Sequence, residues 1–269
     1  GRGRRWDGCR YARPIVFRRG RRQLPPEPSR LFTDHLTDWP LLAASEQERL
    51  VEMVTELLWS RRWEGARGFD LTDEMCTVIA AQVALVCLGF EEEGLAAVHE
   101  LKTIIVHPRT ITLRGPHHDG GGLVSDGPRR LSGEAHDGTG PLLLAWDSVR
   151  RETRSRVGRR NVVIHEVAHK LDMLDGVIDG TPPLEQDGQM TSWVEVSTAE
   201  YEAVRNRSDH LPRPLIDDYA GTNTAEFFAV VSEVFFTRPV DMAAAHPDLY
   251  HCYRDFYRQD PAARRRSQP

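Results

Sequence analysis

The stretch NVVIHEVAHKLDMLDG, residues 161–176, places two histidines and a glutamate inside a run of apolar side chains. The apolar members follow the spacing of a largely buried helix; they are Val162, Val163, Ile164, Val167, Ala168 and Leu171. A buried polar side chain costs free energy unless it is hydrogen-bonded or binds a ligand. The segment therefore predicts a helix over 161–174 whose polar residues have a partner.

His165 and His169 are four residues apart, so on a helix their rings project from one face about one turn apart. This spacing lets two imidazoles reach a single tetrahedral zinc ion, as in the HExxH motif. Glu166 is the next residue, close enough to act on a metal-bound water without binding the metal. The alternative is a pair of hydrogen-bonded core histidines, and the apolar surroundings favour the metal site.

A catalytic zinc site needs a third protein ligand and keeps its fourth position open. Because LDMLDG follows His169, there is no third histidine at HExxHxxGxxH spacing, and a later carboxylate is expected. The candidates are Glu185, Glu195, Glu200, Glu202, His210, Asp217, Asp218, Glu226 and Glu233. Glu226 and Glu233 lie seven residues apart in the apolar NTAEFFAVVSEVFF, on one face of a predicted helix. Glu226 also fits a capping box with Asn223, so spacing alone leaves both glutamates open.

The order of predicted elements is helices, then a small β-sheet, then helices, which indicates an α+β domain. Two N-terminal helices are predicted in SEQERLVEMVTELLWSRR, with Ser45 and Glu48 as a capping box, and in the central LTDEMCTVIAAQVALVCLGF. LKTIIVHP and TITL predict short strands, and two more strands flank DGTG as a hairpin, with PLLLAWD as an edge strand. Helices are then predicted at 161–174, 191–207, 223–237 and 246–258.

These elements predict one α+β domain between two terminal segments. Residues 1–30 form a basic arm, 31–261 the domain and 262–269 a tail; within the domain, 31–100 are helical, 101–150 hold the sheet and 161–261 are the helical catalytic part. Residues 1–22 carry nine arginines and one aspartate, which leaves a net charge of −13 on the remainder. The arm could bind nucleic acid or be disordered; lack of hydrophobic periodicity favours disorder, so direct nucleic-acid binding is not expected.

Cysteine usage and hydropathy predict a cytoplasmic protein. Cys9, Cys76, Cys87 and Cys252 form no CxxC and no disulfide-like spacing, and Cys76 and Cys87 are expected to be buried free thiols. No run of 18 apolar residues is present, so no membrane contact is expected. The N-terminal residues also lack the apolar stretch of a secretory signal peptide.

Several long motifs make the chain resemble the Mlc titration factor A (MtfA) family of bacterial zinc metallopeptidases. They are NVVIHEVAHKLDMLDG, IDDYAGTNTAEFFAVVSEVFF and FYRQDP, together with GFDLTDEM, LSGEA and GPLLLAWDSV. The likeness runs from about Leu31 to Pro261. It implies a zincin-like metallopeptidase fold of the gluzincin type, with a small β-sheet, an HExxH helix and a later helix that carries the glutamate ligand.

The resemblance also implies the site and two functions. It implies one Zn²⁺ per chain on His165, His169 and Glu226, with Glu166 as general base and Tyr219 as an active-site tyrosine. The first function is hydrolysis of a peptide or protein substrate. The second is regulation: the family is named for binding Mlc, a repressor of glucose-uptake genes. A regulatory protein that sequesters such a transcription factor, with latent peptidase activity, is therefore the alternative.

Other polar residues receive weaker interpretations. Asp172 and Glu233 are candidates to accept the second N–H of a ligating histidine. The proline-rich segment 177–190 is long enough to act as a lid. His117, His118, Asp119 and His136 are expected in flexible polar loops rather than in a second metal site.

Overall fold

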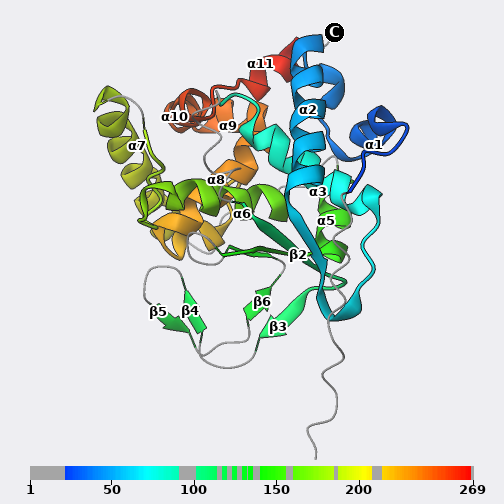
Figure 1. Cartoon of the computed structure of the whole chain (residues 1–269). Coiled ribbons are helices and arrows are strands. Elements are labelled where there is room, and N and C mark those ends of the chain that lie inside the picture. Colours follow the sequence, from blue (N-terminus) through cyan, green and yellow to red (C-terminus); the bar gives the residue numbers. More distant parts are fainter. Residues whose placement is uncertain are drawn as a thin grey trace, which may run out of the picture.

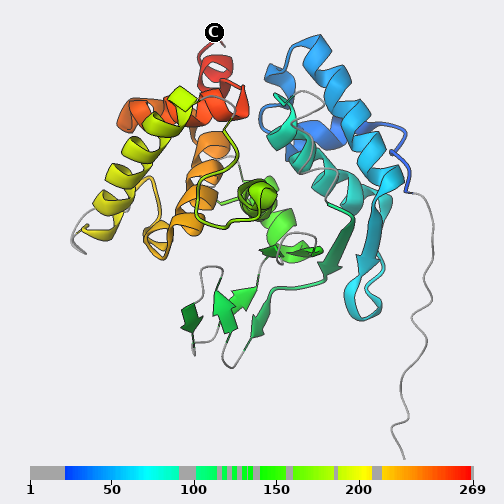
Figure 2. The same ribbon diagram turned by 60° about the vertical axis from the view of Figure 1, so that its left-hand side comes forward.

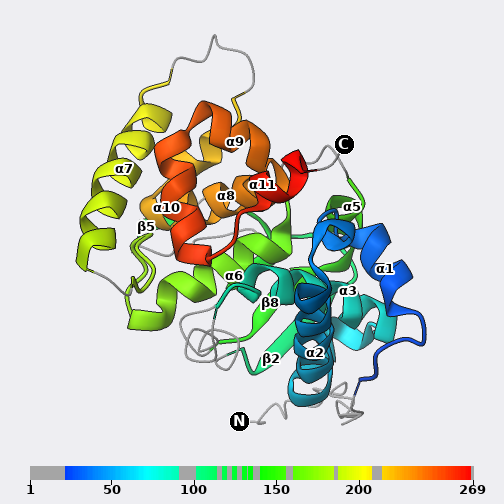
Figure 3. The same cartoon turned by 90° about the horizontal axis from the view of Figure 1, so that it is seen from above.

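Helix α6 (Val162–Asp172) occupies the centre of the molecule, between two groups of helices (Figure 1). The computed structural model describes residues 22–90, 101–113, 117–119, 123–125, 129–131, 133–135, 140–155, 160–184, 187–207 and 214–267. Helix α3 (Asp73–Cys87) packs against one side of α6, and α8 (Thr224–Thr237) packs against the other. Seen from above in Figure 3, α6 runs between the N-terminal and the C-terminal helices. The helix that carries both histidines is thus part of the core.

Helices α3 and α8 are buried on nearly all sides, because their sequences are apolar on every face. This confirms the prediction that the second N-terminal helix is central. Thr72 caps α3, its hydroxyl oxygen accepting a hydrogen bond from the Met75 N–H at 3.2 Å. Cys76 and Cys87 on α3 are buried free thiols, as predicted, whereas Cys9 lies outside the described residues.

The N-terminal helices α1 and α2 cover the outer side of α3. They are α1 (Pro28–His35), the 3₁₀ turn η1 (Trp39–Leu41) and α2 (Ala44–Ser60). The predicted capping box of Ser45 and Glu48 is wrong, because the N-cap of α2 is Ala43, two residues earlier, and the helix begins at Ala44. The carboxylate of Glu46 accepts a hydrogen bond from the Ala43 N–H at 2.9 Å and so defines that start.

A four-stranded sheet lies beside α6, in the order β1-β2-β8-β7. Its parallel strands are β1 (Arg62–Gly65), β2 (Thr103–His107) and β8 (Leu142–Ala145), and β7 (Gly133–Ala135) pairs antiparallel with β8. The predicted hairpin around DGTG is confirmed by this last pairing. The prediction of PLLLAWD as an edge strand is wrong: β8 is interior, and its continuous apolar run is typical of a strand buried on both faces. The edge next to α6 is β7.

Two short antiparallel ladders extend from this sheet at the bottom of Figure 1. One pairs β3 (Ile111–Leu113) with β6 (Arg129–Leu131), and the other pairs β4 (His117–Asp119) with β5 (Leu123–Ser125). The His-His-Asp segment that was expected in a loop is therefore strand β4. Its side chains, like residue His136, lie outside the described part of the chain.

The C-terminal half is helical, as predicted (Figure 2). Its helices pack through aromatic side chains. Its elements are α5 (Trp146–Thr153), η4 (Met173–Asp175), α7 (Asp187–Arg205), η5 (Asp218–Gly221), α9 (Pro239–Ala245), α10 (Pro247–Tyr257) and α11 (Pro261–Arg266). Trp193 of α7 stacks on Tyr253 of α10, with ring centroids 5.0 Å apart. Helices α5, α9 and α11 were not predicted; the last three helices each begin with a proline, which suits the first helical position.

Both ends of the described chain are tied to the core. The Arg22 guanidinium donates to the Leu71 carbonyl at 2.7 Å and pairs with Asp73 at 3.1 Å. Arg265 of α11 pairs with the buried Asp38 at 2.8 Å. The division into arm, domain and tail stays a prediction. Among the described residues, no helix combines the length and the apolarity needed to cross a membrane.

Candidate metal centre

The start of α6 is held by two side-chain oxygen atoms. The Asn161 side-chain oxygen caps the helix, accepting hydrogen bonds from the N–H groups of Val163 (3.2 Å) and Ile164 (3.3 Å). A carboxylate oxygen of Glu152, from α5, accepts from the Val162 N–H at 2.9 Å. Negative charge at this end also suits the helix dipole. These contacts fix the position from which His165 and His169 project.

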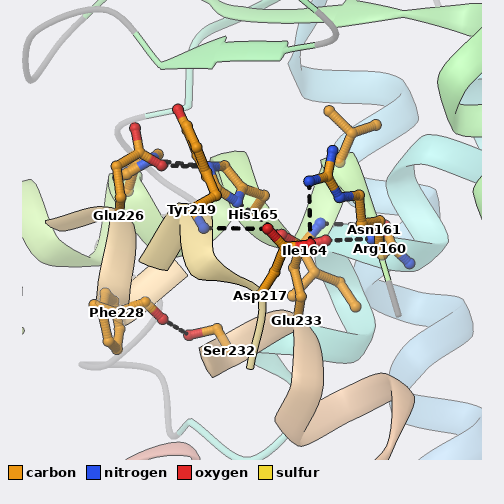
Figure 4. Close-up of polar contacts among 12 residues, drawn as sticks. Arg160, Asn161, Ile164, His165, Asp217, Tyr219, Glu226, Phe228, Ser232 and Glu233 are labelled. Carbon is orange, nitrogen blue, oxygen red and sulfur yellow. Dashed lines mark hydrogen bonds and ion pairs between the residues drawn. The ribbon is translucent and has the colours of Figure 1, made fainter. Parts of the chain in front are cut away.

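The start of α8 sets the direction of Glu226. The Asn223 side-chain oxygen accepts a hydrogen bond from the Glu226 N–H at 2.8 Å, so Asn223 is the N-cap. The Glu226 carboxylate itself points to the histidines of α6 (Figure 4). The capping interpretation of Glu226 is therefore right for its backbone, while its side chain faces the HExxH helix.

Three side-chain atoms converge between α6 and α8. The Nε2 atoms of His165 and His169 are 3.2 Å apart, and Oε2 of Glu226 lies 3.1 Å from the first and 3.6 Å from the second. A tetrahedral metal ion with bonds of about 2.0–2.1 Å separates its ligand atoms by about 3.3 Å. The observed distances bracket that value, so this group could bind one metal ion.

The Glu226 oxygen is the atom that most needs such a partner. Oε2 of Glu226 is shielded from solvent and makes no hydrogen bond of good geometry to any described residue. A buried carboxylate oxygen without a partner is costly, and a cation satisfies it. Burial alone would raise the pKa of Glu226, but His165 and His169 hold that pKa well below its usual range. The carboxylate is thus ionised and aimed at the two imidazoles.

Glu233 occupies the other side of the His165 ring. Its Oε1 lies 2.8 Å from His165 Nδ1, and its Oε2 accepts a hydrogen bond from the Asn161 N–H at 2.5 Å. A carboxylate beside Nδ1 keeps a proton on that nitrogen and leaves the Nε2 lone pair facing Glu226 and His169. The supporting contact predicted for Glu233 is therefore present in the structure.

The two carboxylates beside His165 favour a proton on its ring. Burial opposes a positive charge on its ring, but the carboxylates of Glu226 and Glu233 raise its pKa well above the ordinary value. A ligating imidazole must be neutral, so metal binding has to displace this proton.

Asp172 does not take the supporting role suggested for it. Both of its oxygens lie 3.0 Å from the Gly180 N–H, which donates to them, and burial raises the pKa of Asp172 to about 6. Gly180 has a φ of +81°, and a Cβ there would lie 2.3 Å from the Thr224 carbonyl oxygen. The Trp193 indole also donates to the Gly180 carbonyl at 3.2 Å. Asp172 thus anchors the segment after α6 beside the start of α8.

Glu166 and Tyr219 flank the cluster. Glu166 follows His165 on α6 and is buried, and its charge acts on His165. Tyr219 lies on η5, with its ring centroid 6.3 Å from that of His165 and 42% of its surface exposed. Asp217 caps η5 by accepting from the Tyr219 N–H at 3.1 Å and pairs with Arg160, the residue before the N-cap of α6, at 3.5 Å (Figure 4).

The remaining candidate ligands lie in other contacts or outside the described residues. Glu200 pairs with His246 at 2.9 Å, and Asp218 pairs with Arg207 at 2.9 Å. Glu195 and Glu202 are exposed on α7, whereas Glu185 and His210 are not described. Sequence reasoning missed Asn161, Glu152 and Arg160; of these, only Asn161 had a detectable signal, as an N-cap residue directly before an apolar run.

Comparison with known proteins agrees with this geometry. The family model for the glucose-regulated metallopeptidase M90 family matches residues 11–258. Proteins named Mlc titration factor A from Edwardsiella ictaluri and Serratia proteamaculans are 34% and 33% identical to the chain, over 84% and 81% of it and 86% and 82% of their own lengths. An uncharacterised protein of Synechocystis is 32% identical over 89% of the chain and 86% of its own length. The chain therefore belongs to the glucose-regulated metallopeptidase M90 family.

Proposed function

We propose that the protein is a zinc-dependent peptidase whose metal ligands are His165, His169 and Glu226. The observation that carries this proposal is the separation of the three ligand atoms, 3.1, 3.2 and 3.6 Å, which fits one face of a tetrahedron. Two imidazoles and one carboxylate are a donor set typical of catalytic zinc. When bound, zinc supplies Lewis-acid chemistry: it polarises a carbonyl and makes water a nucleophile near neutral pH.

In this proposal Glu166 handles the proton. It is the buried carboxylate next to His165, so it can take a proton from the attacking water and give it to the leaving amine. Tyr219 is half-exposed beside the His165 ring, where its hydroxyl can donate a hydrogen bond to the oxyanion that develops on the substrate. Each residue acts on a different part of the scissile peptide group.

The sheet edge suggests how a substrate chain is held. Among the described strands, β7 pairs with β8 alone, and it packs against α6. Its other edge is where an extended peptide would add as a further strand. Pairing through the backbone would orient the scissile bond along α6 and leave side-chain selection to the surrounding residues. This replaces the interior strand β8 as the expected docking edge.

The test is cleavage of a mixed peptide library by the zinc-loaded protein beside the Glu166→Gln variant. We expect the wild type to cut and the variant to bind one zinc per chain without cutting. Cleavage retained in the variant would remove Glu166 as the base. A wild type that binds one zinc per chain and cuts nothing would argue against the peptidase function.

A second function is favoured by the relatives that are named Mlc titration factor A. In this reading the chain binds a Mlc-like transcription repressor, and its peptidase activity is latent. Titration of purified Mlc repressor with wild type and with the Glu166→Gln variant tests it. Equal binding by both proteins is expected, because sequestration does not use the proton-transfer residue; absence of binding by either would exclude this function for that repressor.

A further inference from the structure

Gln82 is a polar residue in the middle of the apolar helix α3. Its side chain is 2% exposed, so its amide has to find partners within the protein. Nε2 of Gln82 donates to the His35 carbonyl of α1 at 2.7 Å, and Oε1 accepts from Nδ2 of Asn161 at 2.8 Å. Gln82 therefore joins the N-terminal helices directly to the residue that begins α6.

The orientation of both amides is forced by the groups at the two ends. The His35 carbonyl can only accept, so Gln82 must present Nε2 to it and Oε1 to Asn161. Asn161 must then present Nδ2 to Gln82, which leaves its oxygen facing the N–H groups of Val163 and Ile164. Each hydrogen bond in this row has one possible direction.

The row continues to the metal centre through the backbone of Asn161. The Asn161 N–H donates to Oε2 of Glu233, and Oε1 of Glu233 holds the Nδ1–H of His165. Asn161 thus has two tasks: its side chain caps α6, and its backbone orients Glu233. Gln82 holds the Asn161 side chain in the rotamer that caps α6, and the cap in turn fixes the backbone position from which the Asn161 N–H reaches Glu233.

We propose that Gln82 is a positioning residue for the metal centre and acts through Asn161 and Glu233 on His165. This inference rests on the proposed metal site. Without the Gln82 oxygen, Nδ2 of Asn161 is a buried donor that has lost its hydrogen bond to Gln82, so the Asn161 side chain gains by rotating toward another acceptor. Rotation weakens the cap and shifts the N–H that holds Glu233, so His165 is less well oriented.

The test replaces Gln82 by methionine, which keeps the length of the side chain and removes both hydrogen bonds. Thr77→Val is the matched control, because Thr77 is a buried polar residue of the same helix that donates to the Asp73 carbonyl, within α3. Zinc affinity is measured by competition with a chelating dye, and the ligand field by the visible spectrum of the cobalt-substituted protein. We expect Gln82→Met to weaken zinc binding by about fivefold to tenfold, below the 10–100-fold typical of a direct outer-sphere partner. Thr77→Val should leave zinc affinity and the cobalt spectrum unchanged.

A double-mutant cycle with Glu233→Gln then separates positioning from general damage to the core. If Gln82 acts through Glu233, Gln82→Met weakens zinc binding much less in the Glu233→Gln background than in the wild type. Should Gln82→Met fail to fold, Asn161→Asp serves instead, since it keeps the capping oxygen and removes the donor to Gln82. Additive effects in the cycle, or equal zinc affinities for Gln82→Met and Thr77→Val, would overturn the positioning role alone. A wild type that binds no zinc would overturn the proposed metal centre as well.

Discussion

Replacing Glu233 by glutamine tests whether the carboxylate behind His165 sets the metal affinity of the site. The two groups that contact Glu233 are both donors when His165 binds a metal: the Nδ1–H of His165 at 2.8 Å and the Asn161 N–H at 2.5 Å. A carboxylate accepts both hydrogen bonds, whereas a glutamine side chain has one acceptor oxygen and turns its NH₂ group toward the other donor. The exchange keeps the shape of the side chain. It places the glutamine NH₂ group against one of the two N–H donors, so that donor loses its acceptor.

The magnitude follows from this loss of one acceptor in a buried place. A hydrogen bond to a charged group contributes about 1.5–3 kcal/mol, and removal of an outer-sphere partner typically weakens metal binding 10–100-fold. That range corresponds to about 1.4–2.7 kcal/mol. Because Glu233 is buried, water does not readily replace the missing acceptor. We therefore expect zinc affinity to fall within this range, with the ligand set unchanged.

Zinc affinity is measured by competition with a chelating dye at fixed pH, and Glu152→Gln is the matched control. Glu152 is another largely buried carboxylate at the start of α6, where it accepts from the Val162 N–H and from Arg151 but contacts neither histidine. The control should lower the free energy of unfolding and leave zinc affinity nearly unchanged. Zinc affinity of Glu233→Gln within about twofold of the wild type would refute the argument. Equal losses in both variants would assign the effect to the charge at the helix start.

Four further predictions concern the same site and the core around it. Because the carboxylates beside His165 raise its pKa above about 6.5, zinc binding near pH 7 should release about one proton, seen as a dependence of calorimetric enthalpy on buffer ionisation. The same pKa shift stabilises the metal-free protein. This stabilisation is complete below about pH 6.5 and is lost as the pH rises through the folded-state pKa of His165. The melting temperature of the metal-free protein should therefore fall over that pH range, while the melting temperature of the zinc-loaded protein rises. Tyr219→Phe should lower kcat by about 100-fold without changing zinc affinity; equal kcat would exclude the oxyanion role. Burial raises the pKa of Cys76 and Cys87 to about 12, so both thiols should resist a disulfide reagent at pH 8 until the protein unfolds, and rapid labelling of the native protein would contradict their burial.

The parts of the fold that could be predicted are those with a strong local signal. The helices that became α6 and α8 have long apolar periodicity and an asparagine cap, so their existence did not depend on the rest of the chain. Strand β1 has no such signal, because RWEG is short and charged and forms a strand only by pairing with β2. The interior position of β8 in the sheet likewise depends on its pairing with β2, a strand that is distant in sequence from the β7–β8 hairpin.

Within the site, helical spacing explains why Glu226 and Glu233 could not be separated. Seven residues are nearly two full turns, so both carboxylates face α6 with equal justification. In the structure both glutamates contact His165, because its imidazole ring has two nitrogens. Nε2 faces Glu226 and Nδ1 faces Glu233, at 3.1 and 2.8 Å. Gln82 was undetectable for a different reason: its partner Asn161 is 79 residues away, and no local pattern marks such a contact.

The rigidity of this arrangement has a consequence for metal binding. The ligand atoms lie on two core helices whose starts are fixed by caps and carboxylates, so the site is expected to keep its shape when metal is removed. Three lone pairs facing one another would repel, and in the metal-free protein a proton on Nε2 of His165 relieves that repulsion by pairing with Glu226. A proton and a metal ion then compete for the same place. Acid should therefore release zinc from a site that stays folded, rather than by unfolding the helices that build it.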